Sequence, residues 1–485
     1  MQTKSKTRRT HSHAENLFSV IPTPIRLNAE GRFTGKGVTI AVIDAGFYPH
    51  PDLVRQGNRI LAYHDVTDPG AVLDASQSPE PWDWHGTQTS VTAAGNGFLS
   101  DGIFRGLASD SNVVLVKVSE RGRITEENIA RGLKWVIHNR RHYNIRIASI
   151  SLGGDDDVPY QNNLVDQLAE EAVRQGIVVV VAAGNSGCTD RHHTVPPANA
   201  PSVITVGGYD DANQLGNPEL HLYCSSFGPT ADGLIKPEIV APARWIAAPI
   251  LPRTDFYRKA EALSQIAAAP DYELRAPAPR LFQSAGLAPP PGADPDSIRS
   301  AANTLIRESK IISTHYQHVD GTSFAAPIVA SLIAQMLEAN PGLTPPVIKN
   351  ILIATASRIR NAPAIRQGYG KLNARAAVEA AAVEQHDLNP DRFSAPRIER
   401  EHLVFSFHDH FAQRVGLAGD FNQWNAHLLF RKEPDGIWRA RISIPQSGRY
   451  RYKFVVDDNR WIDDPANGWK EPDSYGGFNS VVTVM

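Results

Sequence analysis

The sequence has little cysteine, little net charge and only short hydrophobic runs. Its 485 residues include two cysteines, Cys188 and Cys224, so we expect no disulfide framework. Lys and Arg number 49 against 51 Asp and Glu, a formal net charge of −2, which excludes a strongly basic nucleic-acid binder. The longest apolar run, residues 177–183, is shorter than the roughly 20 residues of a membrane-spanning helix. We therefore expect neither nucleic acid nor a membrane as a partner.

The N-terminal segment is basic, but no apolar stretch with a small-residue cleavage site follows it, so it does not have the pattern of a secretory signal. Hydrophobic residues make up 42% of the chain, which is enough for more than one core. From these observations we expect a cytoplasmic protein with several domains.

The first part of the chain alternates apolar, β-branched runs with helical patterns. Helices are predicted over 125–142, with Thr125 as the N-cap, and over 164–175, with Gly176 as the C-cap. Strands buried on both faces are predicted at 38–44, 113–118, 145–152, 177–183 and 203–208. This alternation predicts an α/β fold around a parallel sheet.

Two later segments depart from this pattern. Residues 249–310 are rich in Pro and Ala and hold two short helix candidates, 256–267 and 296–310, so we interpret them as a surface insertion. After a linker at 386–397, short strands alternate with turns such as Pro434-Asp435-Gly436, a pattern typical of a small all-β sandwich.

Four motifs of the first part carry chemistry. Asp44 ends a predicted strand, His85 opens a helix, Asn185 follows a buried strand, and Ser323 begins a helix. Acyl transfer needs a hydroxyl nucleophile, an imidazole base, a carboxylate that fixes the imidazole tautomer, and hydrogen-bond donors for the oxyanion. These four side chains supply each of those parts.

The motifs resemble those of the subtilases, the subtilisin-like serine proteases, over about residues 20 to 385. The serine motif is matched by Gly321, Thr322, Ser323, Ala325 and Pro327. The resemblance implies a subtilisin-like three-layer fold, catalytic Asp44, His85 and Ser323, and Asn185 at the oxyanion. Ala45 and Gln88 depart from the usual family residues, which leaves a weakened enzyme as an alternative.

The same resemblance implies a peptide-binding cleft. Residues Ser151, Leu152, Gly153 and Gly154 would pair with an extended substrate, and Ala182, Ala183 and Gly184 would line the specificity pocket. Asp156 lies in an acidic run directly after this edge. We hypothesise that it favours Arg or Lys before the scissile bond; the alternative is a solvated acidic turn.

The resemblance leaves metal and activation open. Asp52 matches a calcium-ligand position of the family, but the remaining oxygen ligands cannot be identified from the sequence. The sequence therefore leaves open whether a structural Ca²⁺ binds there. The chemistry itself requires no cofactor. Residues 17–27 could lie across the active site as an inhibitory extension or form an inert arm.

The C-terminal part resembles the glycogen-binding domain of the AMP-activated kinase β subunit, an early-set (Ig-like) sandwich. The resemblance makes Trp424 and Trp461 the sugar-stacking aromatics, Lys453 a basic donor and Asn479 an amide contact. Tyr475 and Gly477 replace residues that the family pattern expects. Core tryptophans in a stabilising or protein-contacting domain are the alternative.

These inferences give one expected organisation: an N-terminal extension (1–27), a subtilisin-like domain (28–385), a linker (386–397) and an early-set sandwich (398–485). The expected function is that of a serine endopeptidase acting on polypeptides, with the sandwich directing it to glycogen or another α-glucan. The alternative is a non-proteolytic carbohydrate- or protein-binding protein with a decayed subtilase domain.

Overall fold

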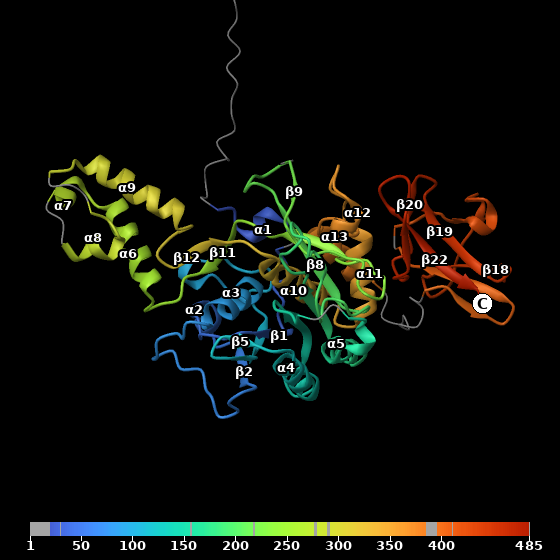
Figure 1. Cartoon of the computed structure of the whole chain (residues 1–485), viewed down its shortest axis with the longest axis horizontal. Coiled ribbons are helices and arrows are strands. Elements are labelled where there is room, and N and C mark those ends of the chain that lie inside the picture. The colour runs from blue at the N-terminus through green and yellow to red at the C-terminus, as the bar shows by residue number, and fades with distance from the viewer. Residues whose placement is uncertain are drawn as a thin grey trace, which may run out of the picture.

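The computed structural model describes residues 20–29, 31–155, 158–216, 219–275, 279–288, 292–384, 395–409 and 411–484. Asp156, residues 17–19 and most of the predicted linker lie outside these ranges. An α/β domain (20–384) occupies the middle of the molecule, with a helical unit at one end and the C-terminal domain (395–484) at the other (Figure 1).

A parallel sheet forms the centre of the α/β domain, in the order β10-β8-β7-β6-β1-β3-β2, with the short antiparallel β9 beside β8. Its strands are β1 (Thr39–Asp44), β2 (Ile60–Asp65), β3 (Asn112–Lys117), β6 (Ile145–Ile150), β7 (Val178–Ala182), β8 (Ile204–Asp210), β9 (His221–Leu222) and β10 (Ile239–Pro242). All five predicted strands are present. Each of β1, β3, β7 and β8 has mostly buried residues, because helices cover both faces of the sheet.

Helices complete the two outer layers. One face packs on α3 (Asp83–Ala94), α10 (Thr322–Ala339), α11 (Pro345–Thr355) and α13 (Ala374–Val383), and the other on α4 (Glu126–Asn139) and α5 (Leu164–Arg174). The Thr125 hydroxyl accepts from the amide of Asn128, which confirms the predicted N-cap of α4. Gly176 has a φ of 88°, which confirms the predicted glycine at the C-terminal end of α5. The fold is the predicted three-layer α/β arrangement.

Among the described residues, α10 is the one helix long and apolar enough to cross a membrane, but 83% of its apolar window is buried inside the protein. It packs against β6, β7 and β8 and against α3 and α13, so it is the central helix of the core. Shorter elements of the domain are α1 (Thr23–Arg26), α2 (Pro51–Val54), α12 (Ala364–Gln367), β4 (Ser119–Glu120) and β5 (Arg123–Ile124).

Cys188 and Cys224 are bonded to each other, which gives the protein a single disulfide rather than a disulfide framework. The loop after β7 and the segment after β9 are brought together at this point, and the Gly187 amide donates to the Cys224 carbonyl (2.9 Å). The two cysteines are 36 residues apart, and their proximity depends on tertiary packing that no local pattern reveals.

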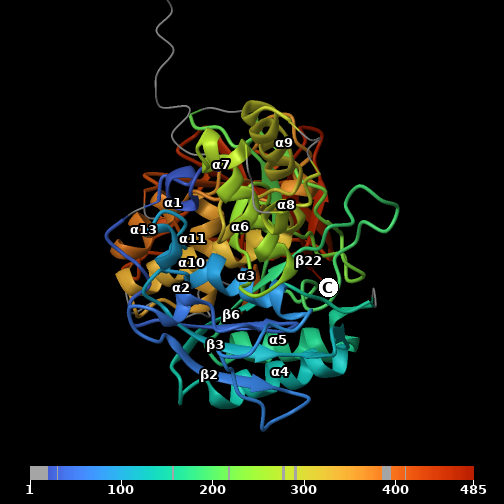
Figure 2. The same ribbon diagram turned by 90° about the vertical axis from the view of Figure 1, so that its left-hand side faces the viewer.

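The predicted insertion is a helical unit with its own hydrophobic core. Between β11 (Ile246–Pro249) and β12 (Tyr316–Val319) lie α6 (Asp255–Ala268), α7 (Asp271–Arg275), α8 (Pro279–Ala285) and α9 (Pro295–Glu308). Figure 2 shows these helices gathered above strands β2, β3 and β6. Leu263, Ile266, Phe282 and Ile298 form the core of the unit. Helices α6 and α9 were predicted; α7 and α8 are too short to produce a helical period.

The C-terminal domain is an antiparallel sandwich, as predicted. One sheet has the order β13-β14-β18-β17 and the other β16-β15-β19-β22-β21, with β20 beside β19. The strands are β13 (Arg397–Glu399), β14 (His402–Phe407), β15 (Val415–Gly419), β16 (Leu428–Leu429), β17 (Arg431–Lys432), β18 (Trp438–Ser443), β19 (Gly448–Val456), β20 (Arg460–Ile462), β21 (Lys470–Pro472) and β22 (Phe478–Val484). Phe405, Leu417, Trp438 and Phe454 fill the space between the sheets.

Candidate active site

Asp44 and His85 form a hydrogen-bonded pair at the carboxyl edge of the sheet. Asp44 is the last residue of β1 and is fully buried, and His85 lies in the first turn of α3. Nδ1 of His85 lies 2.7 Å from Oδ1 of Asp44. Oδ1 also accepts from the Ala45 amide (2.7 Å), and Oδ2 accepts from the hydroxyl of Thr89 (2.9 Å), one turn after His85. These contacts fix the carboxylate, which places the imidazole proton on Nδ1 and leaves Nε2 as an acceptor.

Asp44 also sets the protonation of the imidazole. Burial works to lower the pKa of His85, but the negative charge of Asp44 and the hydrogen bond between the two side chains outweigh it. The pKa of His85 is therefore raised above its ordinary value.

Ser323 is the second residue of α10, directly after Gly321 and Thr322. Gly321 has a φ of 140°, a conformation that other residues rarely adopt. The Ser323 hydroxyl donates to the carbonyl of Ser151 (3.3 Å), and the Ser151 hydroxyl donates to the carbonyl of Ser323 (2.8 Å). The ring of Phe324 lies 6.0 Å from that of His85, so the start of α10 reaches the imidazole.

Asn185 follows β7 and is oriented by Thr322. Its Oδ1 accepts from both the amide and the hydroxyl of Thr322, each at 3.0 Å. The Thr322 hydroxyl in turn accepts from the amide of Gly184 (3.2 Å). Because the carbonyl end of the Asn185 side chain is occupied, its NH₂ group faces the other way. Sequence reasoning missed Thr322 as an orienting residue, although its place next to Ser323 in the motif was a usable signal.

The predicted substrate edge and pocket wall follow neighbouring strands. Residues Ser151 to Gly154 leave β6, while Ala182 ends β7 with Ala183 and Gly184 after it. The Gly154 amide donates to the Pro196 carbonyl (2.8 Å), and a Cβ on Gly153 would lie 2.7 Å from Val195. Parallel neighbours β6 and β7 end at the same sheet edge, so the structure brings these two predicted groups together.

Glu126, the first residue of α4, was missed as part of this edge. A Cβ added to Gly154 would overlap Oε1 of Glu126, so the carboxylate lies directly against the backbone there. Asn163 donates to Oε2 (2.9 Å), while Oε1 is buried without a hydrogen-bond partner. A helix-starting Glu is common in proteins, so nothing in the sequence distinguished this one.

Asp52 is held by protein donors. Its Oδ1 accepts from the Leu99 amide (3.1 Å) and its Oδ2 from the Tyr316 hydroxyl (2.6 Å). Within the described ranges, no group of three or more His, Cys, Asp or Glu side chains could hold a metal ion. Whether Asp52 takes part in a calcium site, which the sequence left open, is not tested by these contacts.

The described part of the N-terminal segment, residues 20–27, contacts residues outside the predicted active site. The amide of Ile21 donates to Asn213 (2.8 Å), and Arg26 forms an ion pair with Asp211 (3.2 Å). None of these partners belongs to the predicted active site.

On the C-terminal domain, the four predicted sugar-binding residues line one cavity. It has a volume of about 730 Å³, and Trp424, Trp461, Lys453, Asn479 and Tyr475 all contribute to its wall. Trp461 is 46% exposed, and the indole N–H of Trp424 donates to Asp420 (3.0 Å). Neither indole belongs to the hydrophobic core.

Comparisons with known proteins find a matching family for each of the two domains. A model of the subtilase family matches residues 35–370, and a model of the glycogen recognition site of AMP-activated protein kinase matches residues 402–485. The chain is 33% identical to the serine protease AprX of Bacillus subtilis over 353 residues, covering 70% of this chain and 66% of AprX. It is 34% identical to the major intracellular serine protease of the same organism, covering 37% of this chain and 54% of that protein.

Among solved structures, a mutant of the protease domain of PatA matches with 21% identity and a TM-score of 0.47, covering 73% of this chain and 98% of that one. The chain spans just under two thirds of AprX and about half of the second relative. Because the family model covers more than half of the sequence, this chain belongs to the subtilase family.

Proposed function

We propose that the protein is a serine endopeptidase in which Ser323 is the nucleophile. The supporting observation is the 2.7 Å pair of Asp44 and His85 at the sheet edge that Ser323 also reaches. When a peptide binds, the Ser323 hydroxyl turns from the Ser151 carbonyl to Nε2 of His85, which takes its proton as Oγ attacks the scissile carbonyl. Asp44 holds the imidazole and stabilises the imidazolium that forms.

The developing oxyanion meets two donors, the NH₂ group of Asn185 and the Ser323 amide at the start of α10. Helix starts leave such amides without intrahelical partners. His85 then gives its proton to the leaving amine, and water attacks the acyl-enzyme by the same route in reverse. A serine-directed fluorophosphonate probe tests this proposal. Labelling at Ser323 supports the peptidase, and absence of labelling supports a binding protein with a decayed site.

The raised pKa of His85 predicts the acid limit of activity. Only the neutral ring accepts the Ser323 proton, so activity falls as the pH drops through the pKa of His85. We expect the acid limb of kcat/KM to lie above the pH at which an ordinary histidine titrates. A pH profile of peptide cleavage measures it. In Asp44→Asn the residual activity should titrate at lower pH; an unchanged acid limb would contradict the role of Asp44.

We further propose that the cleft prefers basic substrate residues, with Glu126 as the acidic group. The carboxylate lies against Gly154 on the edge that an extended substrate would pair with, and its buried Oε1 has no hydrogen-bond partner within the protein. Asp156 lies outside the described residues, so its part in this preference stays a prediction.

Glu126→Gln should lower kcat/KM about tenfold for peptides with Arg or Lys upstream of the scissile bond, because one charge-assisted hydrogen bond is lost. Neutral peptides should be cleaved at an unchanged rate. Glu127→Gln is the matched control, because Glu127 is exposed and pairs with Arg131 on the same helix. A peptide library that shows only apolar preferences for the unsubstituted enzyme would refute the proposal.

We propose, finally, that the C-terminal domain binds α-glucan. The support is the cavity that exposes Trp461 beside Trp424, with the polar groups of Lys453 and Asn479 in the same wall. Aromatic faces suit the apolar faces of glucose rings, and the polar groups suit their hydroxyls.

Trp461→Ala should remove the protein from a glycogen pull-down, because about 1.5 to 3 kcal/mol of apolar contact is lost with the indole. Tyr272→Ala, which removes an exposed aromatic side chain from the helical unit, should leave the pull-down unchanged. If the unsubstituted protein stays in the supernatant, the glucan proposal fails while the peptidase proposal is unaffected.

A further inference from the structure

One residue of the α/β domain lines the cavity of the C-terminal domain. Arg358 shares the wall with Trp424, Trp461 and Asn479. It lies after α11, on a segment that Ser357 anchors by a bridge to Lys371. The sequence offered no sign of this, since Arg358 and the tryptophans belong to different domains.

The position of Arg358 is fixed by contacts between the two domains. Lys470 of β21 bonds both the Tyr369 hydroxyl and Asp463, and Leu234 forms a β-bridge with Trp469. The Asn350 side chain of α11 also donates to the carbonyl of His408 in the C-terminal domain (3.4 Å). These contacts hold the α/β domain against the edge of the sandwich where the cavity opens.

The guanidinium of Arg358 has unused donors at this place. Its Nη2 lies 3.8 Å from Oδ1 of Asp463, an ion-pair distance rather than a hydrogen bond, and its Nη1 lies 3.6 Å from the position of a Cβ on Gly477. The side chain is 44% exposed, and among the described residues we find no hydrogen-bond acceptor for it. Asp463 is already paired with Lys470, so most of the five N–H donors are available to a ligand.

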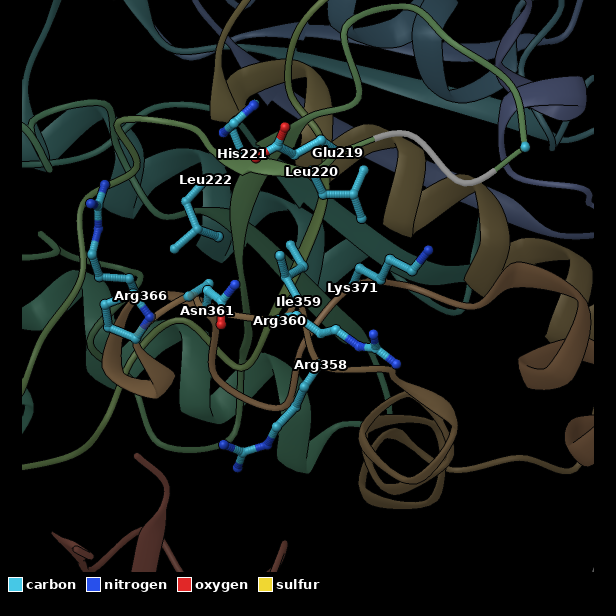
Figure 3. Close-up of a pocket in the computed structure, with 13 residues that line it drawn as sticks. Glu219, Leu220, His221, Leu222, Arg358, Ile359, Arg360, Asn361, Arg366 and Lys371 are labelled. Carbon is cyan, nitrogen blue, oxygen red and sulfur yellow. The ribbon is translucent and has the colours of Figure 1, made fainter. Parts of the chain in front are cut away.

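A second cavity borders the same segment, and Arg358 is also part of its wall. It has a volume of about 800 Å³, and Arg360 and Lys371 line it with Leu220 and Ile359. Figure 3 shows Arg358 extending toward the ribbon of the C-terminal domain, while Arg360 and Lys371 lie near each other on the opposite side. Arg358 lines both cavities, whereas the exposed Arg360 lines this second one but not the one with the tryptophans.

We propose that Arg358 is a glucan-binding residue, so that the sugar site is shared between the two domains. The proposal rests on the proposed glucan function and adds a donor that the sandwich alone does not have. A guanidinium in the same cavity wall as two indoles can donate to the hydroxyls of a glucose ring that stacks on them. Bound glucan would then contact both domains and stabilise their docking, since a ligand favours the state that binds it.

The test is a calorimetric titration of the full chain with β-cyclodextrin, a ring of α-1,4-linked glucose, in a Ser323→Ala background that prevents self-cleavage. Arg358→Ala should raise Kd about tenfold, as expected for a hydrogen bond from a charged group. Arg358→Lys, which keeps the charge but not the planar fork, should raise Kd by less. Arg360→Ala is the matched control and should leave Kd unchanged.

Tyr369→Phe separates direct contact from docking, because it removes an interdomain contact without touching the cavity. If it raises Kd as much as Arg358→Ala does, Arg358 acts only through docking and the proposal is overturned. Unchanged Kd in Arg358→Ala, with binding lost in Trp461→Ala, also overturns it and leaves the glucan function standing. If the chain with an intact cavity does not bind β-cyclodextrin, both the glucan function and this inference fail.

Discussion

Ser323→Ala is expected to lower kcat by about a millionfold, the loss found when the nucleophile of a subtilisin-type triad is removed. The substitution deletes one oxygen from the start of α10 and leaves the bond from the Ser151 hydroxyl to the Ser323 carbonyl in place. The measurements are turnover of a peptide substrate and labelling by a fluorophosphonate probe. Labelling should disappear while the unfolding temperature stays within a few degrees of that of the unsubstituted protein.

The control for this prediction is Ser300→Ala. Ser300 is an exposed serine of α9 in the helical unit, and neither turnover nor labelling should change there. Labelling that persists in Ser323→Ala would place the reactive nucleophile elsewhere and contradict the assignment. Turnover that is absent in both the unsubstituted and the substituted protein would instead identify a decayed site.

The positions of the proposed catalytic side chains in the fold could be predicted from sequence because each is attached to a local pattern. Asp44 is the last residue of an apolar strand and Asn185 lies three residues after the end of another, and the carboxyl ends of parallel strands meet at one edge. Ser323 begins the longest apolar helix of the α/β domain, so its position followed once the sheet was predicted. The strands, the helix caps and the sandwich follow from the same kind of local information.

What could not be predicted depends on residues far apart in the chain. Tyr316 bonds Asp52 across 264 residues, and Thr322 orients Asn185 across 137. The bond between Cys188 and Cys224 and the position of Glu126 against Gly154 are of the same kind. None of these contacts leaves a periodic signal, because each arises from how complete elements pack rather than from the sequence around either residue.

Asn185→Ala is the second large effect, with kcat expected to fall by about 10²–10³ and KM to stay nearly constant. In the proposed mechanism the NH₂ group of Asn185 bonds the carbonyl oxygen only as it becomes an oxyanion, so its loss should raise the barrier without weakening substrate binding. Steady-state kinetics on one peptide measures both constants. Asn361→Ala, which removes an exposed amide from the segment beside the second cavity, should change neither.

Thr322→Val extends this prediction to the residue that orients Asn185. Valine keeps the shape of threonine and the backbone N–H that donates to Oδ1, but it loses the hydroxyl that donates to Oδ1 and accepts from Gly184. One of two contacts on the amide is lost, so kcat should fall by about tenfold, less than in Asn185→Ala.

The acid limb of the pH profile of kcat/KM should not move in either variant, because Asp44 still sets the pKa of His85. A rise in KM with constant kcat would mean that Asn185 binds the ground state, and the oxyanion assignment would then be wrong.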